Sequence, residues 1–261
     1  MAVTQVQYFS RALKRSVTFT ALLPFDDPES GNWPEAGPFK TLYLLHGIFG
    51  THTDWLYRTR IQVLAEQKRV AVVMPSGDNG FYLDHPDVGA MYGEFIGREL
   101  VEVTRALFPL SRRRDDTFIA GLSMGGYGAI RNGLHYHETF GWVAGLSSAL
   151  ITYHFENPEN IKHMLHVGDR YYERTFGELD KVKGSDKDPE ALVRRLLEKG
   201  ADMPKLYLCC GTEDFLIEQN RRFRDFLTAS GVDFIYEEGP GAHDWAFWDA
   251  SIGKVLDWLP L

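Results

Sequence analysis

The chain has 261 residues, enough for one α/β domain, and 44% of them are apolar, with 17 Phe and 6 Trp, so it can bury a large core. Its charged fraction of 25% is ordinary, which excludes an intrinsically disordered chain. The 36 acidic residues outnumber the 28 basic ones, and the net charge is −8. Nucleic acid is therefore not an expected partner, because its binding needs a basic face.

The sequence begins with MAVTQVQYFSRALKRS, which lacks the apolar segment of a secretory signal. No apolar run approaches the ~18 residues of a membrane-spanning helix, so no membrane association is expected. Cys209 and Cys210 are adjacent, and neighbours on a strand point to opposite faces, so a disulfide between them is not expected. Reduced cysteines favour a cytoplasmic protein.

Apolar, β-branched runs alternate with helical patterns along the chain. An N-terminal strand is expected around Val3–Phe9, and further strands are predicted at Ser16–Leu23, Thr41–His46, Val70–Pro75, Thr117–Ala120, Trp142–Leu146, Leu206–Cys210 and Phe234–Glu237. Helices are predicted at Trp55–Gln67, Glu94–Phe108, Gly126–His135, Gln219–Ser230 and Trp245–Leu259. This alternation predicts an α/β fold with a mostly parallel central sheet and helices on both faces.

A glycine-rich turn follows the strand predicted at Thr117–Ala120. Its sequence, Gly121-Leu122-Ser123-Met124-Gly125-Gly126, contains G-x-S-x-G between a strand and a helix. Such a turn strains the serine backbone so that the hydroxyl is presented above the sheet, and flanking side chains would collide with the neighbouring strand and helix. We therefore predict that Ser123 is the nucleophile of an α/β-hydrolase. The alternative is a serine that only packs a helix onto a strand.

The loop after the strand at Thr41–His46 has the sequence Gly47-Ile48-Phe49-Gly50. In α/β-hydrolases one oxyanion donor is the amide after the nucleophile, here Met124, and the other comes from a loop after an earlier strand. Ile48 is the predicted second donor, with Phe49 as the alternative.

His46 lies too early in the chain to be the base in the order Ser, acid, His. We expect it to shape the loop by hydrogen bonding. A metal site formed by His46 and His52 is not expected, because it would need further ligands at compatible spacing.

Residues 147–203 are rich in His, Tyr, Glu, Asp and Lys and contain no strong strand pattern. They lie between two predicted core strands, where an insertion would cover the strand ends. We predict a small cap-like insertion in a single domain of residues 1–261. The alternative is an extra surface helix with two loops, and the charged stretch Asp180–Glu190 is expected to be a solvated loop.

Two carboxylates follow the strand at Leu206–Cys210. A carboxylate there can reach the histidine of the nucleophile and hold its tautomer. Asp214 is preferred because it precedes the apolar pair Phe215-Leu216, which can bury and orient it. Glu213 is the alternative.

The last predicted strand leads to Gly239-Pro240-Gly241-Ala242-His243-Asp244. His243 is the only one of nine histidines that follows the acid candidates, so it is the predicted base. Asp244 is expected to cap the last helix. The order Ser123, Asp214, His243 is that of an α/β-hydrolase triad.

Three aromatic residues near these motifs are candidates for the walls of a substrate pocket: Trp55, Tyr82 and Trp245. Ordinary core packing is the alternative for each of them.

The segments LLHGIFGTHTDW, PSGDNGFY, GLSMGGYGA, CGTEDF and GAHDWAFW resemble an esterase family of α/β-hydrolases. That family includes tributyrin esterases, S-formylglutathione hydrolases, feruloyl and acetylxylan esterases and mycolyltransferase antigens. The similarity covers nearly the whole chain and is greatest to the tributyrin-esterase branch. It implies Ser123, Asp214 and His243 as the triad, and activity on short acyl esters without a cofactor.

The resemblance also implies that the amides of Ile48 and Met124 form the oxyanion hole. The formylglutathione branch carries a Cys shortly after its oxyanion glycine, whereas Phe49-Gly50-Thr51 stand here.

We therefore expect a serine carboxylesterase that hydrolyses small esters, acetyl to butyryl, aromatic or carbohydrate-linked, through an acyl-serine. A thioester hydrolase of the S-formylglutathione type and an acyltransferase are the alternatives on the same triad. A module that only binds is not expected, because all three catalytic residue types are present at strand ends. The expected partner is a small-molecule ester, no metal is expected, and self-association of the chain stays open.

Overall fold

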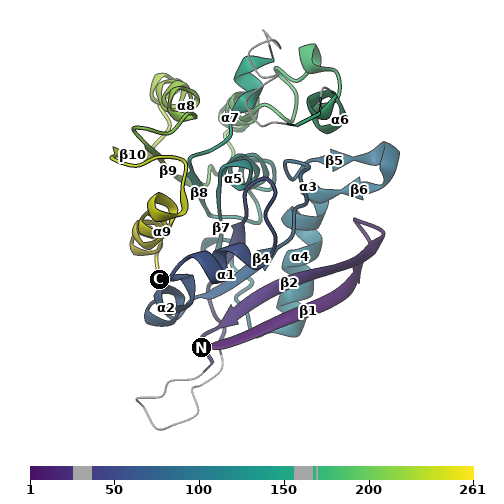
Figure 1. The fold of residues 1–261 in the computed structure, drawn as a ribbon, viewed down its shortest axis with the longest axis vertical. Coiled ribbons are helices and arrows are strands. Elements are labelled where there is room, and N and C mark those ends of the chain that lie inside the picture. The colour runs from purple at the N-terminus through teal and green to yellow at the C-terminus, as the bar shows by residue number, and fades with distance from the viewer. Residues whose placement is uncertain (26–36, 156–166, 169) are drawn as a thin grey trace.

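The computed structural model describes residues 1–25, 37–155, 167, 168 and 170–261, and these form an α/β fold around a central sheet of eight strands (Figure 1). The strands are β1 (Ala2–Ser10), β2 (Arg15–Leu23), β3 (Thr41–Leu45), β4 (Ala71–Pro75), β7 (Thr117–Leu122), β8 (Trp142–Leu146), β9 (Lys205–Gly211) and β10 (Phe234–Gly239). Two short strands that the sequence did not predict, β5 (Asp84–His85) and β6 (Ala90–Met91), pair with each other.

The strand order is β1-β2-β4-β3-β7-β8-β9-β10, and only β2 runs antiparallel to its neighbours. This confirms the predicted mostly parallel sheet of an α/β-hydrolase fold. β3, β4 and β7 are buried along their whole length, as expected for central strands with helices on both sides. The carboxyl ends of β3, β7, β9 and β10 share one edge of the sheet, and every predicted catalytic group follows one of these ends.

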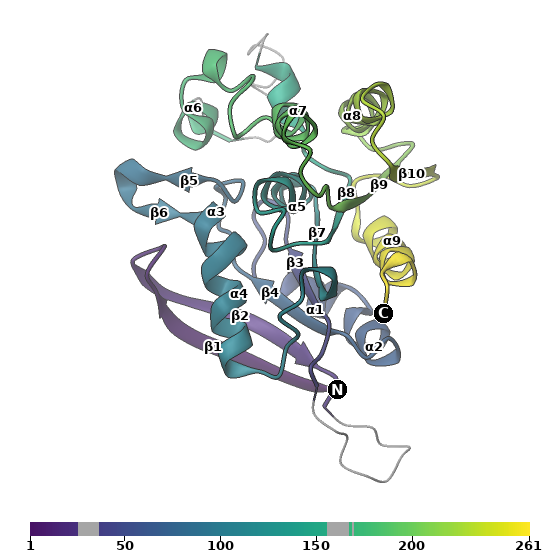
Figure 2. The same cartoon turned by 180° about the vertical axis from the view of Figure 1, so that it is seen from behind.

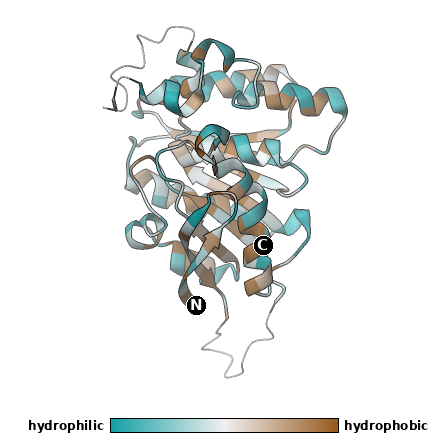
Figure 3. Ribbon diagram, turned by 90° about the vertical axis from the view of Figure 1, so that its right-hand side faces the viewer, coloured by the Kyte–Doolittle hydropathy of each residue, from teal (hydrophilic) through white to brown (hydrophobic). Residues whose placement is uncertain are grey.

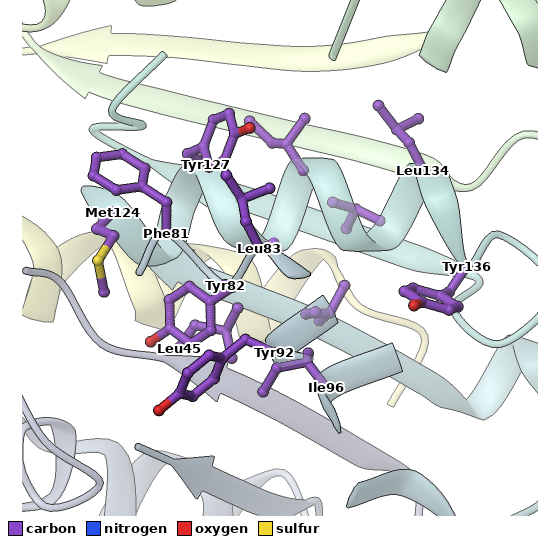
Figure 4. Packing of buried hydrophobic residues seen from close by; sticks show 14 of the residues in the cluster. Leu45, Phe81, Tyr82, Leu83, Tyr92, Ile96, Met124, Tyr127, Leu134 and Tyr136 are labelled. Atoms are coloured by element: carbon purple, nitrogen blue, oxygen red, sulfur yellow. The ribbon is translucent and has the colours of Figure 1, made fainter. Parts of the chain in front are cut away.

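Helices cover both faces of the sheet (Figure 2). One face packs against α1 (Asp54–Arg58), α2 (Ile61–Gln67) and α9 (Trp245–Trp258). The other packs against α4 (Leu100–Leu107), α5 (Met124–His135) and α8 (Ile217–Ala229). Figure 3 shows the hydrophobic residues concentrated in the sheet, and Figure 4 shows the packing of the second face around Tyr82, Met124 and Tyr127.

Two predicted helices differ from the observed ones. The helix predicted at Trp55–Gln67 is divided into α1 and α2, because Thr59 is extended and the Arg60 amide donates to Asp249 Oδ1 at 2.7 Å. The helix predicted at Glu94–Phe108 begins earlier, with α3 (Tyr92–Glu94), and a π-helical turn at Phe95–Glu99 precedes α4. The bounds of the other predicted elements shift by one or two residues, as is usual for element ends.

The segment 147–203 contains short helical elements and, among its described residues, no strand. These elements are 3₁₀ turns at Ile151–His154 and Leu179–Lys181, α6 (Tyr171–Phe176) and α7 (Pro189–Lys199). Residues 156–166 and 169 of the predicted insertion lie outside the described residues. α7 packs against α5, the helix that begins directly after Ser123.

The prediction of a solvated loop at Asp180–Glu190 holds only for part of that stretch, because Asp180, Lys181, Lys183 and Gly184 are exposed whereas Val182, Asp188 and Pro189 are buried. The Asp186 carboxylate pairs with Arg131 of α5, a side chain that is almost fully buried. The hydroxyl of Tyr127, also on α5, donates to the Lys187 carbonyl at 2.7 Å. These two contacts attach the segment to α5.

Candidate active site

Ser123 occupies the sharp turn between β7 and α5. Its backbone has φ 54° and ψ −118°, a conformation that costs a non-glycine residue about 1–3 kcal/mol. Backbone hydrogen bonds hold it there: the Ser123 amide donates to Leu146 O at 2.9 Å, and its carbonyl accepts from Ala149 N at 2.9 Å. The strain is thus imposed by the adjacent β8 and the chain that follows it.

The glycines beside Ser123 are required by close backbone packing. A Cβ on Gly121 would lie 2.3 Å from Gly125 O, and one on Gly125 would lie 2.5 Å from the carbonyl oxygens of Leu45 and His46. Both distances are shorter than van der Waals contact, and the atoms concerned belong to the backbone, which cannot move aside. The G-x-S-x-G spacing therefore follows from the packing of α5 against β7 and the end of β3.

The structure brings the three predicted triad residues together. His243 Nε2 lies 3.0 Å from Ser123 Oγ, and His243 Nδ1 lies 2.9 Å from Asp214 Oδ2. The second oxygen of Asp214 accepts from the Leu216 amide at 2.8 Å, and its carboxylate is completely buried. A carboxylate oxygen can only accept, so Nδ1 carries a proton and Nε2 is left to accept one from the serine.

Glu213, the alternative acid, points to a different partner. Its carboxylate accepts from the Gly241 amide at 2.5 Å and from the Thr212 hydroxyl at 2.8 Å. The Gly241 hydrogen bond, followed by that of Thr212, lowers the pKa of this exposed carboxyl. Glu213 therefore joins the loop after β9 to the loop that carries His243, and Asp214 alone of the two candidates contacts the imidazole.

The His243 ring lies between two aromatic rings. Trp248 of α9 contacts it edge-on with a centroid distance of 4.8 Å, is buried, and donates from its indole nitrogen to Ser147 Oγ at 3.0 Å. Phe215 lies 4.7 Å from the imidazole centroid and is 52% exposed. From the sequence, Phe215 was expected to help bury Asp214, and no role was predicted for Trp248.

The predicted oxyanion donors lie on either side of the serine. Met124 is the first residue of α5, where an amide has no partner within the helix. Within the described part of the chain, neither the Met124 nor the Ile48 amide donates to a protein acceptor. The Phe49 amide, in contrast, donates to Asn79 Oδ1 at 2.8 Å. This supports Ile48 over the alternative Phe49.

His46 fixes the start of the oxyanion loop, as its position predicted. Its Nε2 lies 2.8 Å from the Gly77 amide nitrogen and must accept, so Nδ1 carries the proton and donates to Gly47 O at 2.6 Å. Burial lowers the pKa of this histidine, which favours the neutral ring that these two bonds require. Both ring nitrogens of His46 are thus hydrogen-bonded to backbone atoms, which agrees with the predicted role in shaping the loop.

Asn79 belongs to the PSGDNGFY segment, and the sequence predicted no role for its side chain. Its side-chain oxygen holds the Phe49 amide, and its backbone carbonyl accepts from the hydroxyl of Tyr171 in α6 at 2.5 Å. Phe49 has a left-handed φ of 67°, which is unfavourable for this residue type. Asn79 thus connects the oxyanion loop to the 147–203 segment.

Two of the three predicted pocket walls are buried supports of β3. Trp55 donates from its indole nitrogen to Leu45 O at 2.9 Å, and Tyr82 donates from its hydroxyl to His46 O at 2.9 Å. Both side chains are at most 1% exposed, so they present no surface to a ligand. Figure 4 shows Tyr82 close to Leu45 inside the core. They hold the carboxyl end of the strand that leads to Ile48.

Trp245, the third predicted wall, is half-buried. It packs edge-on against Trp55 and Trp248 with centroid distances of 5.6 and 5.2 Å, and the Arg58 guanidinium lies 5.5 Å from its ring centroid. Trp248 therefore lies between it and His243. Asp244 caps α9 as predicted, accepting from the Phe247 amide at 2.9 Å.

A sheet of this order with a serine on the turn between strand and helix defines a serine hydrolase of the α/β-hydrolase fold. Residues 10–259 match the model of the family described as "Putative esterase", and the chain belongs to that family. It is accordingly an enzyme that acts on ester bonds.

Similar proteins are known by sequence and by structure. An acetyl esterase of Caldicellulosiruptor saccharolyticus is 43% identical over 261 residues, covering 99% of this chain and 98% of the relative. A substrate-bound fluorophosphonate-binding serine hydrolase F and an S-formylglutathione hydrolase, both from Staphylococcus aureus, are 33% and 34% identical. Each of these two structures superposes with a TM-score of 0.86, over 99% of this chain and 98% of the other.

In the part of the chain that the structure describes, no helix has the length and apolar character needed to cross a membrane.

Proposed function

We propose that this enzyme hydrolyses carboxylic esters of small acyl groups, acetyl to butyryl, with Ser123 as the nucleophile. The observation that carries the proposal is the hydrogen-bond chain from Ser123 Oγ through His243 to the buried Asp214. The full-length similarity to an acetyl esterase supports the choice of acyl group.

Acylation follows from this geometry. His243 Nε2 removes the hydroxyl proton of Ser123 as Oγ attacks the ester carbonyl, and Asp214 stabilises the imidazolium. The carbonyl oxygen becomes negative and is bound by the amides of Ile48 and Met124. His243 then delivers its proton to the alcohol oxygen, the bond between that oxygen and the acyl carbon breaks, and the alcohol leaves.

Deacylation repeats these steps with water as the nucleophile. His243 takes a proton from the water while the hydroxide adds to the acyl carbon, and the oxyanion donors act again. The proton returns to Ser123 Oγ as its bond to the acyl carbon breaks, and the acid is released. The ester and one water molecule are the only reactants that these two half-reactions consume.

We further propose that residues 147–203 form the cap over the acyl side of the site. The attachment of this segment to α5 through Arg131 and Asp186, and to the oxyanion loop through Tyr171 and Asn79, supports this role. A wall fixed in this way would limit the length of the acyl group.

Thioester hydrolysis of the S-formylglutathione type is the second candidate. A full-length S-formylglutathione hydrolase structure with 34% identity favours it. The measurement that decides is kcat/KM for S-formylglutathione beside that for 4-nitrophenyl acetate. A clear preference for the thioester would replace the ester proposal while leaving the triad unchanged.

The test of the nucleophile is Ser123→Ala, which removes one oxygen atom and should leave the fold intact. We expect loss of ester hydrolysis and of labelling by a fluorophosphonate probe, while circular dichroism and thermal unfolding stay as in the parent. Asp244→Ala, which changes a nearby helix cap, is the control and should keep the label. Retained activity in the Ser123 variant, with labelling at another serine, would contradict the assignment.

We also propose that the protein works in the cytoplasm. Cys209 and Cys210 are both free and buried, and burial raises the pKa of the Cys209 thiol to about 12. Such thiols suit a reducing compartment. Cell fractionation with antibodies to the chain would test this.

A further inference from the structure

We propose that Phe215 is the platform for the alcohol part of the substrate and selects esters whose alcohol carries an apolar ring. This inference rests on the proposed ester hydrolysis and concerns the leaving-group side of the same site. The two aromatic neighbours of His243 differ in exposure: Trp248 is buried, and Phe215 is half exposed.

The exposed ring contributes little to the core. Phe215 is 52% exposed. Trp248, the other aromatic residue that contacts the imidazole, is 5% exposed and is fixed by its hydrogen bond to Ser147. Asp214 and Trp248 together already orient His243. A large apolar side chain left in solvent beside a catalytic base is therefore available to a ligand.

The reaction determines which part of the substrate meets this ring. When the alcohol leaves, its oxygen must lie within hydrogen-bond distance of His243 Nε2, roughly 3 Å, because that atom supplies its proton. The Phe215 centroid is 4.7 Å from the imidazole centroid. Because the alcohol oxygen and the Phe215 ring both lie beside the imidazole, we place the first carbons of the alcohol against that ring, with the carbonyl oxygen bound by the amides of Ile48 and Met124.

An aromatic platform prefers a flat apolar partner. Offset or edge-on ring pairs are favoured beyond the area they bury, whereas a methyl group covers little of the ring. The alcohol classes that fit are benzyl and phenyl groups and sugars that present an apolar face. A methanol or ethanol ester should gain little from this side chain.

The two half-reactions separate recognition from support of the base. The acetyl-enzyme is the same intermediate whichever alcohol has left, and its hydrolysis involves His243 but no alcohol. A residue that binds the alcohol affects acylation only. A residue that positions His243 affects both steps.

The experiment uses Phe215→Ala in the full chain, with kcat/KM for benzyl acetate and methyl acetate as the measure of acylation. We expect the benzyl-to-methyl ratio to fall about tenfold, the scale of a lost aromatic contact with its buried area. The deacylation rate constant, measured after a stopped-flow burst with 4-nitrophenyl acetate, should stay within about twofold of the parent. For Phe215→Leu we expect a benzyl-to-methyl ratio between that of the parent and that of Phe215→Ala.

Phe9→Ala is the matched control, because Phe9 is 64% exposed on β1, the outer strand that β2, β4 and β3 separate from β7. It should change neither rate. Equal losses in acylation and deacylation, or equal losses for both acetates, would overturn the proposal and make Phe215 a positioning residue for His243. An unchanged ratio would also overturn it. Failure of the proposed function itself would be visible earlier, since the parent would form no acetyl-enzyme.

Discussion

The strand ends that carry the triad and the segment 147–203 are held in place by different kinds of contact. At the strand ends, glycine packing and backbone hydrogen bonds fix Ser123 and the loops around it, so main-chain atoms make most of these contacts. The described part of the segment 147–203 is instead attached to α5 and to Asn79 through individual side chains, such as Asp186 to Arg131 and Tyr171 to the Asn79 carbonyl. The first region therefore sets the backbone geometry of Ser123 and its loops, and the second contacts it mainly through a few side chains.

The two regions meet at Asn79 and α5. α5 presents its first residue, Met124, to the site and its buried Arg131 to the segment. The difference between the strand ends and the segment 147–203 therefore predicts two classes of variant. Changes at the strand ends should reduce the rate for every ester, whereas changes at the contacts of the segment should alter stability or selectivity.

The largest effect is expected from Asp214→Asn. An asparagine in place of the carboxylate no longer holds the reactive tautomer of His243, and the loss in kcat should be on the order of 10⁴. Glu213→Gln is the control, because Glu213 binds the Gly241 amide and not the imidazole, and it should lose much less. Steady-state kinetics on 4-nitrophenyl acetate measures both. A larger loss in the Glu213 variant would transfer the role of acid to Glu213.

Asp186→Ala tests the attachment of the segment. It leaves the buried Arg131 guanidinium with only the Asp186 carbonyl and Asn132 Oδ1 as acceptors. Because the Asp186 side chain is 43% exposed, solvent screens part of the interaction, and we expect the free energy of unfolding to fall by about 1–3 kcal/mol.

Urea unfolding measures this loss. Glu178→Ala is the matched control in the same segment, because it removes a pair with Lys181 in which both side chains are 69% exposed. Such surface pairs contribute about 0–1 kcal/mol. An equal and small effect of both substitutions would mean that Asp186 does not fasten the segment to α5.

Asn79→Ala should lower kcat about tenfold with a smaller change in KM. The variant removes the acceptor of the Phe49 amide, whose loss is on the scale of 1–3 kcal/mol, and so loosens the loop that presents the Ile48 amide. Asn79→Asp keeps an acceptor at that position and should recover most of the rate. A loss of similar size in both variants would mean that the hydrogen bond to Phe49 does not position the loop.

The sheet and the contact of His243 with Ser123 and Asp214 could be predicted from the sequence, because each depends on local rules. G-x-S-x-G at a strand end and a histidine before the last helix can be recognised without knowing any distant contact. The roles of Asn79, Trp248 and Arg131 could not be predicted in this way. Each acts through a partner 30 to 101 residues away, which only the folded chain identifies.

The same limit explains the error over the aromatic residues. Trp55 and Tyr82 do follow the site motifs closely in sequence, which made them candidates for pocket walls. Their polar atoms instead meet the carbonyls at the end of β3, and their rings fill the core. Sequence proximity to a motif does not show whether a side chain points into the site or beneath it.

The dependence of rate on acyl length tests the difference between the two regions most directly. If the 147–203 segment closes the acyl side, each methylene that fits gains roughly 0.8 kcal/mol, about fourfold, until the wall is reached. Overpacking of roughly 1–3 kcal/mol then reverses the trend. The rate should peak at acetyl to butyryl esters and fall steeply by octanoyl, without activation on emulsified substrate.

Asp186→Ala then distinguishes the two regions in one measurement. Loosening the segment should move the optimum toward longer acyl chains, while Asn79→Ala should lower the whole profile without moving its maximum. A series of 4-nitrophenyl esters from acetyl to octanoyl, measured on both variants and the parent, gives the profiles. A parent profile still rising at octanoyl, or a jump in rate above the solubility limit, would contradict a closed acyl pocket. An optimum that does not move in the Asp186 variant would place the acyl wall on the strand-end loops instead of on the segment.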